Sequence, residues 1–202
     1  MKTSILLRPC NSTIGLLIIL FSLFSGFGQN SEKQSAELNQ KASELPFDIY
    51  WEVKAYKIFN KLLEIKAIDK DGKMHEVKAI QNSEDVSILD VKAFVGDQRL
   101  PIKMIIKNNE RYYPVKAIDG NGNLIDIKAI TPEGKILPVK GVSKTGNVVH
   151  IRAIDEDQSF YNIIAMSPEG EFNHVKGIKM LDNPVETIIN GISIYAHVKS
   201  IK

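Results

Sequence analysis

The sequence predicts an all-β protein: an antiparallel up-and-down meander of about twelve 12-residue β-hairpin repeats. Three observations predict this class. A four-residue core of the form Val/Ile-Lys-Ala-Ile recurs through the chain, mostly 12 residues apart, as from Lys116 to Lys128 to Lys140. A turn-forming segment such as Thr131-Pro132-Glu133-Gly134 stands between successive cores. Within each core, Val or Ile and the Ala fall on one face and the lysine on the other. This two-residue alternation is the period of a β-strand.

Residues 1–28 have the features of a secretory signal peptide. Lys2 and Arg8 provide a positive start, and residues 14–24 form an apolar run too short to span a bilayer. Gly26 and Gly28 are small residues at the right distance from a cut before Gln29. The leader resembles those of exported proteins from Gram-negative bacteria of the Bacteroidetes type. We therefore expect a periplasmic or extracellular protein whose only membrane contact is through the cleaved leader; the alternative is an uncleaved anchor.

The rest of the chain divides into a linker at residues 29–46 and a tandem β-repeat domain at residues 47–202. The linker is rich in Ser, Gln and Glu, and is predicted to be disordered or a frayed helix. Cys10 is the only cysteine and lies in the leader, so no disulfide is expected. Of the 26 basic residues two lie in the leader, which leaves 24 to match the 24 acidic ones. This balance gives no support to nucleic acid or an acidic membrane surface as a partner, so no nucleic-acid partner is expected.

The turn of each repeat has a position that requires positive φ. A type I turn followed by a left-handed residue makes a bulged hairpin connection, and glycine suits the last position best, with asparagine next. The residues predicted to fill this structural role are Gly72, Gly122, Gly134, Gly146, Gly170, Asn60 and Asn109. Gln158 stands at the same position, where strain or a different turn is expected. Asn190-Gly191 predicts one further hairpin, in an atypical C-terminal repeat.

Assigning side chains to strand faces predicts one buried face and one charged face. The Val/Ile row with its flanking Ala and Leu is predicted to be buried. The lysines fall on the other face, where carboxylates across the strands form a charge ladder that keeps a long sheet soluble. Its members are Lys66, Glu76, Lys78, Glu64, Lys116, Asp126 and Lys140, with Asp126 opposite both Lys116 and Lys140, and with Glu64 opposite Lys78. A lysine-lined binding surface is the alternative.

The closure of the sheet is left open by the sequence. Pro101, Pro114 and Pro138 recur two residues before a repeat lysine, and proline cannot donate to a ladder, so a mid-strand break or bulge is expected. The sheet is therefore predicted to form a closed barrel, or to coil or fold over on itself; a β-solenoid is the competing architecture. A closed barrel of this size would leave an apolar cavity.

No catalytic or cofactor-binding constellation is found in the sequence. His150 and His174 are predicted to lie about 10 Å apart, with a strand between them, too far to share a metal ion. Asp155, Glu156 and Asp157 superficially suggest calcium but lack the bidentate Glu of a calcium loop. The aromatic residues, such as Trp51 and Tyr56, fit cross-strand packing as well as glycan binding. No catalytic residue, cofactor or metal is therefore predicted.

The first functional hypothesis is a secreted, non-enzymatic β-repeat protein that serves recognition or scaffolding. Its partner would be an unknown protein or glycan, and free sheet edges would allow self-association. The alternative is a β-barrel that binds an apolar ligand inside. An enzyme built on the loops at 81–85 and 181–184, with Glu84, Asp85 and Asp182, is the weakest hypothesis. The repeat resembles short tandem β-hairpin arrays in general, which imply no function.

Overall fold

The computed structural model describes residues 48–58, 62–107, 110–179, 187–189 and 191–202. They contain thirteen strands: β1 (Ile49–Tyr56), β2 (Leu63–Ile68), β3 (Met74–Gln81), β4 (Ile88–Val95), β5 (Gln98–Ile105), β6 (Tyr113–Ile118), β7 (Leu124–Ile130), β8 (Ile136–Thr145), β9 (Val148–Ile154), β10 (Phe160–Met166), β11 (Phe172–Ile178), β12 (Thr187–Ile189) and β13 (Ile192–Ile201). The predicted leader, the linker, Asn60 and Asn109 lie outside the described residues.

The predicted all-β antiparallel meander is confirmed. Each strand from β1 to β10 pairs antiparallel with the next strand along the chain, β11 pairs with β13, and β12 forms a hairpin with β13. All pairings among the described strands are antiparallel, whereas a β-solenoid stacks its strands in parallel.

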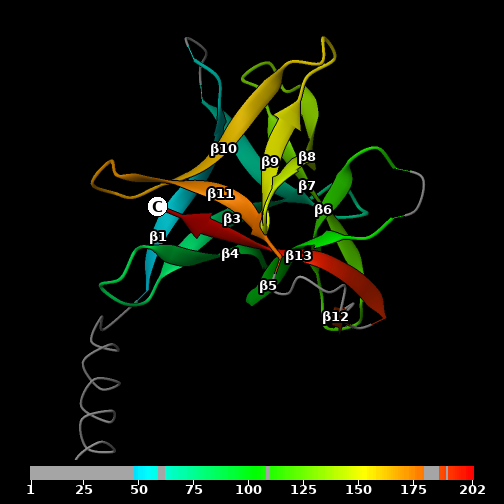
Figure 1. Cartoon of the computed structure of the whole chain (residues 1–202), viewed down its shortest axis with the longest axis horizontal. Helices are drawn as coiled ribbons and strands as arrows, with labels where there is room; N and C mark the ends of the chain where they lie inside the picture. The colour runs from blue at the N-terminus through cyan, green and yellow to red at the C-terminus, as the bar shows by residue number, and fades with distance from the viewer. Residues whose placement is uncertain (1–47, 59–61, 108–109, 180–186, 190) are drawn as a thin grey trace, which may run out of the picture. The chain divides into compact units, whose positions relative to one another are not determined.

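The structure adds pairings that a meander does not have. If the pairing of β12 with β13 is left aside, each of the other twelve strands pairs with three others, and these pairings group the strands into four trios in which each strand contacts the other two. The trios are β1–β2–β3, β4–β5–β13, β6–β7–β8 and β9–β10–β11. Three trios are consecutive in sequence, whereas β4 and β5 are completed by the last strand of the chain. In Figure 1 this strand, drawn in red, runs beside β4 and β5.

Each of the six possible pairs of trios is joined by one pairing between strands. The six connections are β3–β4, β2–β7, β1–β10, β5–β6, β8–β9 and β11–β13. Twelve strands with three partners each, grouped in this way, have the connectivity of the corners of a truncated tetrahedron. Because every repeat has the same buried and outward positions, each copy can form a strand with the same three kinds of neighbour.

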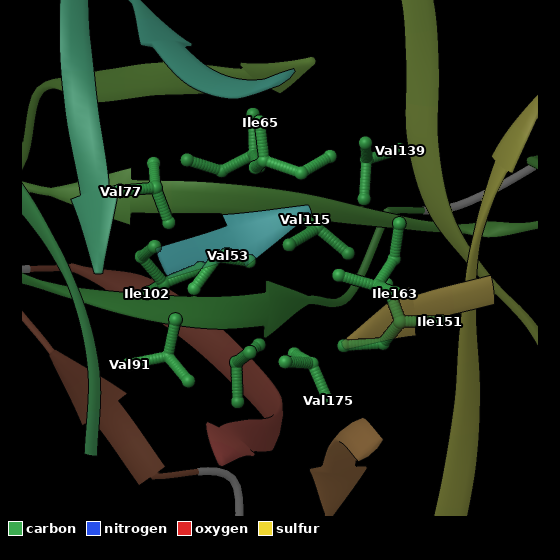
Figure 2. A pocket seen from close by; sticks show the side chains of 12 residues that line it. Val53, Ile65, Val77, Val91, Ile102, Val115, Val139, Ile151, Ile163 and Val175 are labelled. Carbon is green, nitrogen blue, oxygen red and sulfur yellow. The ribbon is translucent and has the colours of Figure 1, made fainter. Parts of the chain in front are cut away.

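The core is built by one branched residue from each strand. The twelve residues are Val53, Ile65, Val77, Val91, Ile102, Val115, Ile127, Val139, Ile151, Ile163, Val175 and Val198. Figure 2 shows their side chains pointing toward one another from strands on all sides. All are nearly inaccessible to solvent, so the predicted buried face is confirmed. The space left at the centre is about 10 Å³, at most a single water molecule.

The residue two positions after each of these is usually Ala, and it is almost completely buried. β5 has Met104 at this position, whereas β8 and β11 have Gly141 and Gly177. A Cβ atom on Gly177 would lie 2.3 Å from Cε of Met104, and one on Gly141 would lie 2.7 Å from its Sδ. The two glycines therefore make room for the one large residue.

Proline is tolerated where a strand changes partner. Pro138 is the last residue of β8 to pair with β7, and Val139 is the first to pair with β9. Pro101 and Pro114 stand at the same kind of junction, after the pairings with β4 and β8 respectively. The missing N–H group thus falls at the end of a ladder, where a donor is not needed. The break expected at the prolines is a change of partner within one strand.

The predicted turn glycines have the expected conformation. Gly72, Gly122, Gly134, Gly146 and Gly170 all have positive φ. Gln158 also has positive φ, at 62°, which is the strain that was predicted there. Its turn has the same two backbone hydrogen bonds as the turns of Gly72, Gly122, Gly134 and Gly170, so the alternative of a different turn is not found. The predicted loop at residues 143–146 is shorter than expected, because β8 continues to Thr145.

Candidate binding site

Two outward positions of each repeat determine the surface of every trio. The lysine position is occupied by Lys54, Lys66, Lys78, Lys92, Lys103, Lys116, Lys128, Lys140, Arg152, Ile164, Lys176 and Lys199. The acid position, two residues earlier, is occupied by Glu52, Glu64, Glu76, Asp90, Pro101, Pro114, Asp126, Pro138, His150, Asn162, His174 and His197. Within a trio, the register places the lysine position of each strand opposite the acid position of a neighbour, so six side chains surround the centre of each trio.

The β1–β2–β3 trio has the complete alternation of charge. Its register pairs are Lys54 with Glu64, Lys66 with Glu76, and Lys78 with Glu52. The Nζ atoms of Lys54 and Lys66 lie 2.5 Å from the carboxylates of Glu64 and Glu76. Glu52 also binds Lys54, at 3.0 Å. These ion pairs make this surface a structural ladder.

The β6–β7–β8 trio has prolines at two acid positions. Asp126 binds both Lys116 and Lys128, the latter at 3.1 Å, and a hollow of about 40 Å³ lies among the side chains. Lys140 instead reaches Glu110, at 2.9 Å. Lys107, together with Lys140, lowers the pKa of Glu110 to about 2.

The β4–β5–β13 trio has one carboxylate for three lysines. Asp90 binds Lys199 and, at 3.6 Å, Lys92. Lys103 instead contacts Nδ1 of His197. Burial, reinforced by the charges of Lys92 and Lys199, lowers the pKa of Lys103 to about 8.

The β9–β10–β11 trio has no carboxylate at either position. Its six residues are Arg152, Ile164, Lys176, His150, Asn162 and His174, with register pairs Arg152–Asn162, Ile164–His174 and Lys176–His150. Within the described part of the chain, no ion pair joins Arg152 or Lys176 to an acidic side chain. We therefore take this surface, which we call the basic face, as the candidate binding site.

The histidines of the basic face lie in a positive environment. Nζ of Lys176 is 3.3 Å from Nδ1 of His150, and Nε2 of His150 is 3.3 Å from Oγ1 of Thr145. Burial, and then the charges of Lys176 and Arg152, lower the pKa of both His150 and His174. The Nδ1 atom of His174 is buried and has no hydrogen-bond partner. The site therefore suits a negatively charged group that accepts hydrogen bonds.

Two of the predicted ladder contacts are wrong. Asp126 does not face Lys140, because Lys140 pairs with Pro114 of β6 and with Arg152 of β9. Glu64 does not face Lys78, because Glu64 pairs with Lys54 and Ile130. Both contacts assumed a flat succession of strands, whereas β1 and β8 close their trios. The predicted contacts of Lys116 with Asp126 and of Lys66 with Glu76 are present.

The prediction that a strand lies between His150 and His174 is also wrong. The two residues were expected to have a strand between them, but β9 and β11 pair directly. The sequence did not single out Arg152 or Lys176, although alignment of the repeats shows His and Asn where carboxylates stand in the early copies. That substitution was the available indication of the basic face.

The described residues contain no group of three or more His, Cys, Asp and Glu side chains able to hold a metal ion. Asp155, considered for calcium, binds Nζ of Lys135 at 2.6 Å, and Asp157 accepts a hydrogen bond from the backbone of Ser159. Asp85 likewise accepts one from the backbone of Ser87, while Asp182 lies outside the described residues. In the described part of the chain, no helix is long and apolar enough to cross a membrane.

Comparison with known proteins assigns the chain to a family. A model of a family of unknown function, DUF7486, matches residues 47–201, so the chain belongs to this family. No curated protein and no solved structure gave a match.

Proposed function

We propose that this member of the family is an exported, non-enzymatic β-repeat protein that serves recognition or scaffolding in the periplasm or at the cell surface. It meets a protein or glycan partner with the outer surfaces of its strand trios. The observation that carries the proposal is the filled core: twelve Val and Ile side chains leave about 10 Å³ at the centre. A partner of any size therefore has to be bound outside.

The non-enzymatic part of the proposal is supported by how the ionisable residues are used. The carboxylates of three trios bind lysines across the strands, and those in the turns accept backbone hydrogen bonds, as Asp69 does from Lys73. These contacts occupy the groups that acid–base chemistry needs. The alternative function, an apolar ligand held inside, has no comparable support, because a ligand would need a cavity of hundreds of Å³.

Export is tested with a reporter enzyme that is active only outside the cytoplasm. Residues 1–46 are fused to the reporter, and the matched control lacks residues 1–28. We expect activity in the periplasm from the first fusion alone; equal cytoplasmic retention of both would overturn the export proposal.

Recognition is tested with the purified protein on a panel of glycans and peptides, measuring both retention and product release. We expect saturable retention without turnover. Release of a product, lost on substitution of a few residues, would contradict the non-enzymatic proposal. A co-purified lipid in native mass spectrometry would favour the internal ligand instead.

A further inference from the structure

The basic face differs from the other three trios in its charge. Each of the others has at least one carboxylate within its six outward positions: Glu52, Glu64 and Glu76, then Asp90, then Asp126. The basic face has Arg152, Lys176, His150 and His174, and no counter-charge among these positions. Lys176 contacts Nδ1 of His150, and Arg152 donates to the backbone oxygen of Ile151, but neither contact supplies a negative charge. Half-buried cations without a counter-charge destabilise a fold unless an anion binds them.

We propose that the basic face is a binding site for an oxyanion group, a sulfate, phosphate or carboxylate, held by Arg152 and Lys176 with His150 and His174 beside them. The proposal rests on the proposed use of the outer surface for binding, and it names the chemistry of what is bound there. Arg152 offers a planar fork that suits two oxygens of one anion, and Lys176 offers a compact charge.

The surroundings do not supply the missing negative charge. Across the edges of the trio, Lys54 of β1 lies opposite Ile164, Lys140 of β8 opposite Arg152, and Lys199 of β13 opposite Lys176. Their carboxylate partners are engaged: Glu52 and Glu64 bind Lys54, Glu110 binds Lys140, and Asp90 binds Lys199. These carboxylates of the surrounding strands are thus already paired with lysines, and they leave Arg152 and Lys176 without a counter-charge.

The buried Nδ1 atom of His174 is the second observation that favours a ligand. Buried polar atoms in native proteins almost always have a partner, and an exception calls for an explanation. An oxyanion bound beside His174 would give its ring the charged partner that the described contacts do not supply. The same anion would neutralise the charges that now lower the pKa of His150 and His174.

The charge balance of the chain limits the size of the anionic group. Without the leader, basic and acidic residues are equal in number, so no long-range field attracts a polyanion. The positive charge is confined to one trio, which fits a single anionic group. Phe172 is 58% exposed, and its ring lies 6.1 Å from that of His174, which offers an apolar contact to whatever carries the group.

The test is a titration of the purified protein with sodium sulfate, phosphate or acetate at constant ionic strength, followed by calorimetry and by backbone NMR. We expect saturable binding of at least one anion, with the largest shifts in β9, β10 and β11. Absence of saturable binding for all three would overturn the proposal.

Asn162→Asp is the decisive variant, because it places a carboxylate at the one acid position that faces Arg152. The repeat itself shows that a carboxylate is accepted there, as Asp126 faces Lys116. We expect the variant to unfold at the same or a higher temperature and to bind the anion at least about tenfold more weakly. Unchanged affinity in this variant would overturn the proposal.

Lys176→Gln is the second variant, with Lys66→Gln as its matched control at the same repeat position on the β1–β2–β3 trio. We expect the first to weaken binding about tenfold and the second to leave it unchanged. Equal losses in both would show non-specific attraction and count against the site.

The pH dependence is a further readout. The groups facing the site are His150, Arg152, His174 and Lys176 on the trio, with Tyr56, Lys54 and Glu52 on β1, Lys140 on β8, and Lys199 on β13. The pKa of both histidines is lowered, so they gain charge only below the usual value of about 6.5, and affinity should rise as pH falls from about 6.5 to about 5. Affinity that falls over this interval would contradict their role.

The source of the anionic group is distinguished by its carrier. Inorganic sulfate is compared with a sulfated oligosaccharide, a uronic-acid oligosaccharide and a phosphopeptide at equal concentration. Tighter binding of one carrier assigns the source, and equal binding of all assigns the free ion. Retention of an uncharged partner without any anion binding would leave the proposed function in place and remove this inference alone.

Discussion

Single residues are most informative where the repeat is broken. The branched residue of each strand was predicted to be buried because strand faces alternate, and the structure confirms this for all twelve. The contacts of the lysines were predicted only in part, because a lysine such as Lys140 faces strands that a flat meander does not bring together. A sequence pattern gives the face of a side chain, but the partner on that face depends on which strands meet.

Met104, Gly141 and Gly177 depart from the repeated residue types, and the two small residues compensate for the large one. We expect Gly177→Ala to destabilise the protein by about 1 to 3 kcal/mol, because the new Cβ atom overlaps the Met104 side chain in a filled core. Met104→Ala alone should cost about 2 to 5 kcal/mol through the cavity that it leaves. The double variant should cost less than the sum, as measured by denaturant unfolding.

The matched control for this cycle is Gly177→Ala with Leu63→Ala, since Leu63 lies in a different trio and is not among the nearest atoms to the new Cβ. These two changes should be additive within about 0.5 kcal/mol. Additivity in the Met104 pair as well would show that the methionine moves aside at no cost.

At the scale of elements, the turns were the most predictable feature. The repeated hydrogen bonds, such as those between Thr131 and Lys135 and between Gly134 and Thr131, are the local geometry that Pro and Gly at these positions favour. The prolines in the strands predict a break or bulge, but a change of strand partner, which explains their position, cannot be seen in the sequence. Local chemistry fixes a turn, whereas a strand's partners are set by the whole fold.

The turn of Gln158 offers the test at this scale. Gln158→Gly should stabilise the protein by about 0.5 to 1 kcal/mol, because it removes the cost of a side chain at positive φ. Gly134→Ala, at φ of 84°, is the control and should have the opposite sign. Denaturant midpoints of both variants check the prediction, and a destabilised Gln158→Gly variant would contradict it.

For the molecule as a whole, the grouping into trios was beyond prediction from the sequence. Pairings such as β1 with β10 and β4 with β13 join repeats that are far apart in the chain and chemically alike. Near-identical strands give no reason to prefer one distant partner over another. The basic face depends on such a pairing, because β9 and β11 meet directly, and it was missed for the same reason.

Completion of the β4–β5–β13 trio by the last strand has a testable effect. A chain that ends at Lys179 lacks β12 and β13, which leaves β4, β5 and β11 each without one of its three partners. We expect it to lose the cooperative thermal transition of the intact chain, as followed by circular dichroism. A chain that begins at residue 47, where the family match starts, is the control and should keep the transition. An equally sharp transition in the shortened chain would contradict the structural role of β13.

The uniformity of the twelve strands also has a consequence for the search for the native state. Strands that present the same residues at the same positions can exchange places with little change in energy, so the folding landscape contains many arrangements close to the native one. A minimum stands out only where strands are not interchangeable. Met104 fits only against glycine, and β8 and β11 supply it in Gly141 and Gly177. The irregular residues thus identify individual strands in an otherwise repetitive chain, and a version with all repeats made identical should fold to a mixture.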